Sequence, residues 1–137
     1  ITRGTTTVAG TNQLDVIKDG VSFSSIDFSK SKLDPLGFAL QEFKIDDPAT
    51  ADEQKLADEL DVYLGLEFFL RQAGGSTNVV ERLKVPKFFL QFQLGRVQLA
   101  KGQKVTLAGG IEHQRQKVIK NARGQASAAE IAAVAAI

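Results

Sequence analysis

The segment DVYLGLEFFLR, which runs from Asp61 to Arg71, is the stretch on which the expected fold depends. Its aliphatic and aromatic residues alternate along the chain, so that every second position is apolar. An alternation of this kind is typical of a β-strand with one buried face. The positions that share this parity are Val62, Leu64, Leu66, Phe68 and Leu70. The segment therefore predicts a long strand.

A second long segment, from Val85 to Leu99, repeats this pattern with Phe88, Leu90, Phe92 and Leu94 on one parity. A shorter apolar run, Leu14 to Lys18, is followed by Asp19-Gly20, which is a signal for a tight turn into a second strand at Val21. Strands joined by short turns favour antiparallel pairing. The sequence thus predicts a mainly β fold, either an antiparallel β-sandwich or a small β-barrel.

Two helices are expected beside the strands. The segment from Pro48 to about Leu60 starts with Asp-Pro, which suits a helix start, and Thr50 to Glu53 fits a capping box. The segment after Ser127 combines a capping box, closed by Glu130, with a run of alanines. We therefore expect one domain over residues 1–137, with an N-terminal arm at 1–12, one internal helix, and a short C-terminal helix in a tail at 124–137.

Charge is distributed very unevenly along the chain. Residues 1–81 contain 7 Lys or Arg and 14 Asp or Glu, whereas residues 82–137 contain 10 Lys or Arg and only 2 Glu. Such an asymmetry points to an electrostatic partner. The two halves can neutralise each other within one chain, meet the opposite half of a second copy, or contact an outside polyanion through the basic C-terminal half.

The residues that usually carry catalysis are scarce. The chain has no Cys, and His113 is its only histidine. The acidic residues between Asp46 and Asp61 do not have the spacing of an EF-hand loop, and helix capping explains them more simply. No phosphate-binding glycine loop is present. We expect no catalytic, cofactor or metal site, and we expect the protein not to be an enzyme.

The leading hypothesis is a non-catalytic structural subunit that self-assembles into a shell, a tube or a filament, as a homo-oligomer in a virion or surface structure. It depends on the Phe-rich β core, on the two ends as reaching elements, and on the complementary charge of the halves. The residues expected to make contacts between copies are Thr5, Thr6 and Thr7 in the arm, Arg115, Lys117 and Lys120 facing an acidic surface, and Glu130, Ile131 and Val134 in the tail.

The alternative is a secreted or envelope binding module for an apolar ligand, a glycan or a protein segment. In that case Phe68, Phe88 and Phe92 would line an apolar cavity. Phe88, Phe89 and Phe92 also lie near the basic residues in sequence, where exposed rings could stack on nucleic-acid bases. No apolar stretch is long enough to span a bilayer. The expected location is a virion or the outside of a cell.

Overall fold

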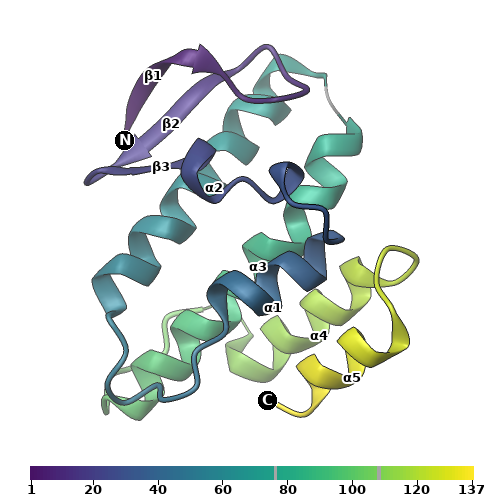
Figure 1. Ribbon diagram of the computed structural model, residues 1–137. Helices are drawn as coiled ribbons and strands as arrows, with labels where there is room; N and C mark the ends of the chain where they lie inside the picture. Colours follow the sequence, from purple (N-terminus) through teal and green to yellow (C-terminus); the bar gives the residue numbers. More distant parts are fainter. Residues whose placement is uncertain (76, 108) are drawn as a thin grey trace.

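The computed structural model describes residues 1–75, 77–107 and 109–137, and it is mainly helical. Its long elements are α2 (Glu53–Ala73) and α3 (Thr77–Ala100), which are consecutive in the chain and pack against each other. Helices α1 (Pro35–Phe43), α4 (Gly110–Ala122) and α5 (Ala128–Ala135) surround the lower part of α3, and a small sheet lies beside α2 (Figure 1). The expectation of a β-sandwich or β-barrel is therefore wrong.

The sheet has three antiparallel strands in the order β1-β2-β3, with bounds Thr2–Thr7, Leu14–Lys18 and Val21–Ser22. The turn predicted at Asp19-Gly20 is confirmed, since both residues have positive φ, at 49° and 81°, as a type I′ hairpin turn requires. The strand after the turn is short because the chain enters two 3-10 turns, η1 (Phe23–Ile26) and η2 (Phe28–Lys30).

The alternation in the segment from Asp61 to Arg71 has a helical explanation. Residues four apart stack on one face of a helix, and a step of four also preserves odd or even parity. Val62, Leu66 and Leu70 form one such row and are buried, while Leu64 and Phe68 form a second row that remains accessible. Two apolar rows on one helix therefore imitate the every-second-residue pattern of a strand.

Helix α2 is covered on several sides, which explains why its apolar residues are spread so widely around it. The sheet approaches closely at Gly65, where an added Cβ would lie 3.0 Å from both Ile1 Cδ1 and Val16 Cγ1. On another face, the hydroxyl of Tyr63 donates a hydrogen bond to Ile26 O at 2.6 Å and accepts one from Phe28 N at 3.3 Å. These bonds fix the 3-10 turns on the helix.

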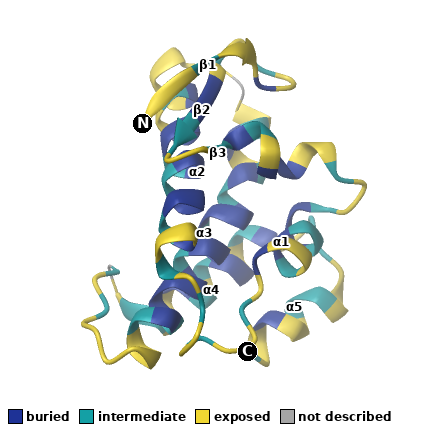
Figure 2. Cartoon of the chain, turned by 60° about the vertical axis from the view of Figure 1, so that its left-hand side comes forward, coloured by how far each residue is buried: buried dark blue, intermediate teal, exposed yellow. Residues whose placement is uncertain are grey.

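The segment predicted as the second long strand, Val85 to Leu99, is the central part of α3. Phe89 and Phe92 are fully buried, and Gly95 brings the next layer close, because a Cβ there would lie 2.9 Å from Leu107 and 3.0 Å from Ile111. The dark core of Figure 2 follows α2 and α3, whereas β1 lies on the outside.

The observed helix starts differ partly from those predicted. Helix α2 begins at Glu53, with Asp52 as its cap, and not at Pro48. The Asp-Pro start signal is used instead at α1, where the Asp34 carboxylate accepts a hydrogen bond from Gly37 N and Pro35 opens the helix. At α5 the predicted capping box is confirmed, since Ser127 and Glu130 bond reciprocally.

Both ends of the chain pack on the same molecule. The N-terminal segment is not a free arm, because β1 pairs with β2 and Ile1 lies over Gly65 of α2. Helix α5 packs against α1 and α4, and its Val134 is fully buried (Figure 1). The view of the termini as reaching elements, and with it the virion or capsid role, therefore loses its basis.

Candidate functional site

The outer edge of β1 is the first candidate for a functional surface. No strand in the described part of the chain pairs with this edge, and five of its six residues are exposed, including Thr5, Thr6 and Thr7. An unpaired strand edge presents a row of N–H and C=O groups that can accept a further strand. Of the predicted contact residues, these three threonines have the most open position.

The edge has few of the features that usually prevent pairing. It contains no proline, and its only charge is Arg3. The Arg3 guanidinium is turned back into the molecule, where it lies 3.8 Å from the centre of the Phe69 ring and donates to Leu14 O at 2.8 Å. One protective feature is present, because the β1–β2 register shifts between Arg3 and Thr7, which is the position of a bulge.

A large apolar side chain lies beside this sheet without cover. Phe68 of α2 is 59% exposed, and it contacts edge-to-face the ring of Phe69, which lies under the Arg3 guanidinium of β1. Ile1, on the strand side, is 60% exposed. Exposed apolar residues next to an open strand edge are typical of a protein contact.

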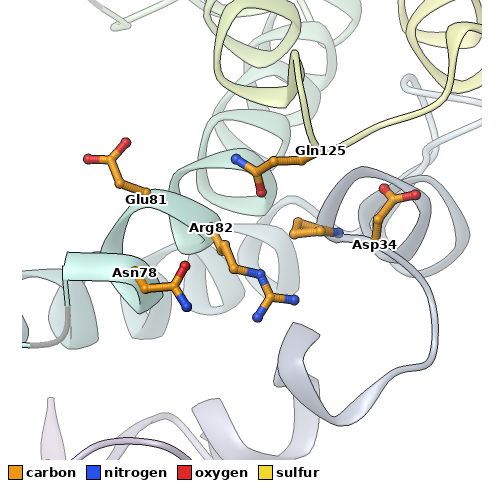
Figure 3. Close-up of a pocket in the computed structure, with 6 residues that line it drawn as sticks. Asp34, Asn78, Glu81, Arg82 and Gln125 are labelled. Atoms are coloured by element: carbon orange, nitrogen blue, oxygen red, sulfur yellow. The ribbon is translucent and has the colours of Figure 1, made fainter.

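The second candidate is a polar pocket of about 420 Å³ between the start of α1, the start of α3 and the connection after α4. Its side chains do not converge on one point. In Figure 3, Arg82 and Asn78 extend to the same side of α3, while Glu81 points away from them. The lining residues are Asp34, Pro35, Asn78, Glu81, Arg82 and Gln125. With two carboxylates beside one guanidinium, the pocket offers no clear preference for an anion.

The predicted contact residues on α4 have different environments. Arg115 is half-buried; it lies 5.0 Å from the centre of the Phe92 ring, pairs with Glu112 and donates to Ile137 O at 2.7 Å. Lys117 is half-buried with its ammonium 5.6 Å from the Phe88 ring, and Lys120 is exposed. Only Lys120 is therefore fully presented to a partner.

The predicted contact residues of the tail serve the chain's own fold. The Glu130 carboxylate accepts a hydrogen bond from Ser127 N at 2.8 Å, and it lies against Gly37 of α1. Val134 is fully buried and Ile131 half-buried. These three residues hold α5 on the bundle, which removes the reason for placing them between copies.

The two charged halves neutralise each other only slightly. Among the described residues, two ion pairs join residues 1–81 to residues 82–137. One is the local pair of Lys84 with Glu81, and the other is the buried pair of Lys87 with Glu67, at 3.0 Å between Nζ and Oε1. Burial lowers the pKa of Lys87, while its bond to Glu67 acts in the opposite direction. The charge asymmetry of the sequence is therefore largely retained in the fold.

The predicted aromatic sites are not formed as expected. Phe89 and Phe92 are fully buried and cannot stack on a base, and Phe88 is half-buried, with the Lys87 ammonium 4.0 Å from its ring centre. Phe68, Phe88 and Phe92 occupy an exposed, a half-buried and a fully buried position. The three rings therefore do not line a common cavity.

The described residues contain neither a cluster of metal ligands nor a helix that could span a membrane. In residues 1–75, 77–107 and 109–137, no three His, Asp or Glu side chains are grouped so that they could hold a metal ion. His113 is exposed on α4, and its ring packs over Gly109. None of the helices in these ranges is both long and apolar enough to cross a bilayer.

Sequence comparison places the chain in a family. A model described as "Domain of unknown function (DUF7143)" matches residues 4–137, which is almost the whole chain. No curated protein and no solved structure gives a significant match. Any function must therefore be argued from the surfaces described above.

Proposed function

The chain belongs to the DUF7143 family of domains of unknown function, and on that premise we propose that it is a non-catalytic structural subunit that self-associates through strand β1. The observation that carries the proposal is the open outer edge of β1, together with the exposed ring of Phe68 on α2, the helix on which the sheet packs. The partner is a second copy of the chain.

A second copy suits this edge for reasons of symmetry. Two identical β1 strands can pair antiparallel about a two-fold axis, which makes the same surface contact itself. The two sheets then join into one of six strands, in the order β3-β2-β1-β1-β2-β3. Threonines, which pair well across strands, are four of the six residues of β1.

Phe68 adds an apolar component to this contact. Ile1, which precedes β1, and Val16 of β2 lie over α2 at Gly65, and Phe68 follows one turn later on the accessible face of this helix. A strand added at the edge extends the sheet over this face and removes apolar surface from water, which stabilises the pair by about 25 cal/mol per Å². A two-fold contact of this kind stops at the dimer, so a tube or filament requires a second contact. The opposite charges of the two halves of the chain favour such a contact between copies.

The proposal is tested by sedimentation velocity over a dilution series, with circular dichroism to verify folding. We expect the unaltered chain to dimerise reversibly and Thr6→Lys to remain monomeric, because a lysine on a strand edge opposes pairing. Thr50→Lys is the matched control, since Thr50 is exposed in the connection between α1 and α2.

A second pair of variants tests the apolar component. Phe68→Asp should abolish the dimer, whereas Leu99→Asp, at a residue that is 62% exposed on α3, should leave it intact. An unaltered chain that is monomeric at every concentration would refute the proposal. Equal loss in Phe68→Asp and Leu99→Asp would show that association is not at β1. The expected location outside the cell stays a prediction.

A further inference from the structure

A groove on the opposite side of the molecule from the sheet combines positive charge with small side chains. It lies between the connection that follows α1, the end of α3 and helix α5, and its volume is about 410 Å³. The small side chains are those of Ala133 in α5 and of Ala136, the C-cap of this helix. The complete lining is Lys44, Ile45, Asp46, Arg96, Ala133, Ala136 and Ile137.

The guanidinium of Arg96 is held firmly without a carboxylate partner. Its Nη1 donates to Ile45 O at 2.9 Å and to the side-chain oxygen of Gln93 at 2.6 Å. Among the described residues no ion pair involves Arg96, and Asp46, the acidic residue of the groove, is 3.9 Å from Lys44. Burial and, after it, the charge of Arg115 lower the pKa of Arg96, while the charge of Asp46 acts in the opposite direction. Arg96 therefore has one like and one opposite charge nearby.

Two buried donors near the groove have no acceptor among the described residues. One is Nε2 of Gln93, a fully buried residue whose Oε1 accepts hydrogen bonds from Arg96 and from Ile45 N. The other is Nε of Arg115, whose Nη2 donates to Ile137 O in the groove wall. A buried donor without an acceptor costs about 1–3 kcal/mol. Neither donor lines the groove, but Gln93 and Arg115 are each joined by a hydrogen bond to a residue that does.

We propose that this groove binds a small oxyanion, a phosphate or a carboxylate, with Arg96 as its principal ligand and Lys44 as a second cation. The lining has two cations, Lys44 and Arg96, against the one carboxylate of Asp46, and this excess of positive charge favours an acceptor-rich, negatively charged group. A planar guanidinium presents a fork of donors that suits these groups. The alanines of α5 leave room for a ligand at that face.

The pocket around Arg82 provides an internal contrast. It has nearly the same volume and one arginine, but its lining includes two carboxylates, Asp34 and Glu81, and no lysine, whereas the groove has Lys44 and the single carboxylate of Asp46. An oxyanion entering there would meet two like charges. Arg82 is therefore a matched control for Arg96.

The test is a titration with inorganic phosphate at constant ionic strength, balanced with sodium chloride, and followed by ¹H–¹⁵N NMR. We expect saturable shifts of the Gln93 side-chain amide and of Arg96 Nε–H, with Arg82 unaffected. A parallel titration with acetate distinguishes a phosphate ligand from a carboxylate ligand. Shifts with phosphate alone identify a phosphate site, and shifts with both anions identify a general oxyanion site. Shifts no larger than those in chloride overturn the proposal.

Variants complete the experiment. Arg96→Gln should weaken phosphate binding about tenfold, which corresponds to one lost charge-assisted hydrogen bond. Because Arg96 also bonds to Ile45 O, Lys44→Gln serves as a second variant on an exposed side chain and should weaken binding by a smaller factor. Arg82→Gln should bind like the unaltered protein. An equal loss in Arg82→Gln would mean non-specific attraction and would refute the site.

Discussion

On each of the helices α2 and α3, another part of the chain packs closely at a glycine. The two contacts differ in whether the neighbouring phenylalanine of the helix is buried. At Gly65 the sheet lies on α2, yet Phe68 of the same helix remains 59% exposed. At Gly95 the segment around Leu107 and Ile111 lies on α3, and Phe92 of that helix has no exposed surface. The layer over α3 thus lies beside a fully buried ring, and the layer over α2 lies beside an exposed one.

The two sides are therefore incomplete in different ways. On the sheet side, the edge of β1 is unpaired and the ring of Phe68 is uncovered. A strand from another polypeptide can pair with the edge and cover the ring. The α5 side is well packed, and its groove has two cations, Lys44 and Arg96, against one carboxylate, so that a small anion can neutralise the excess charge. Incomplete packing points to a protein partner, and unmatched charge points to a ligand.

The largest expected effect is the difference in stability between variants of Phe92 and of Phe68. Phe92→Ala should lower the free energy of unfolding by about 3–5 kcal/mol, because it leaves a cavity in the core beside Phe89. Phe68→Ala should change the stability of the monomer by no more than about 0.5 kcal/mol, as is usual for an exposed site. Urea unfolding of both variants at low protein concentration measures this. A similar loss in both would mean that the ring of Phe68 is covered as well as the ring of Phe92.

The predictive value of the sequence can be judged from the same helices. Two local signals, the Asp19-Gly20 turn and the Ser127–Glu130 box, were read correctly, whereas the helix start predicted at Pro48 was wrong. The long apolar segments were misread, because residues four apart share both a helical face and a parity, as Val62 and Leu66 do. Length was the better guide, since a helix tolerates ten or more such residues and a strand usually does not.

The surfaces could not have been predicted from the sequence, for a different reason. The exposure of Phe68 depends on where the sheet stops, and the groove at Arg96 depends on how α5 lies against residues near Lys44. Both are properties of tertiary packing, which one sequence does not report. The threonines of β1 were identified as contact residues, but for their place in an arm and not for their place on a sheet edge.

The next effect compares two ion pairs. The Glu67–Lys87 pair links α2 to α3, and each side chain is only 10% exposed, whereas the Glu81–Lys84 pair is on the surface of α3. Glu67→Gln should cost about 3 kcal/mol, because it leaves the Lys87 charge buried without its carboxylate. Glu81→Gln should cost less than about 1 kcal/mol. Thermal unfolding measures both, and equal costs would show that the inner pair is effectively hydrated.

Glu67→Leu combined with Lys87→Leu sharpens the same comparison. Replacing both members of a buried pair with apolar residues is often close to neutral. We expect the double variant to be more stable than Glu67→Gln alone. A double variant that is less stable than the single one would mean that the pair itself stabilises the contact between α2 and α3.

Alkaline pH tests the attachment of the 3-10 turns to α2. Burial and the charge of Asp27 raise the pKa of Tyr63 well above its ordinary value. The unfolded chain ionises this group near pH 10 and the folded chain does not, so the stability it provides is complete below about pH 10 and decreases as the pH rises further. Tyr63 is the only tyrosine, so tyrosinate absorbance reports it alone.

The corresponding variant is Tyr63→Phe, which should remove this pH dependence. It should cost about 1–2 kcal/mol at neutral pH, because it removes the donor to Ile26 O and leaves a buried carbonyl without its partner. A tyrosine that titrates near pH 10 in the folded protein would contradict the buried position.

The smallest effect concerns the α5 side and connects stability to the proposed anion groove. Ser127→Ala removes the capping box and should lower the free energy of unfolding by about 1 kcal/mol. Because Ala133 and Ala136 form one wall of the groove, loosening α5 should also weaken phosphate binding, although Ser127 is not in the lining. The dimer should be unaffected, since β1 is on the other side of α2. A cap variant that loses the dimer and retains phosphate binding would reverse the assignment of the two sides and would refute the distinction between them.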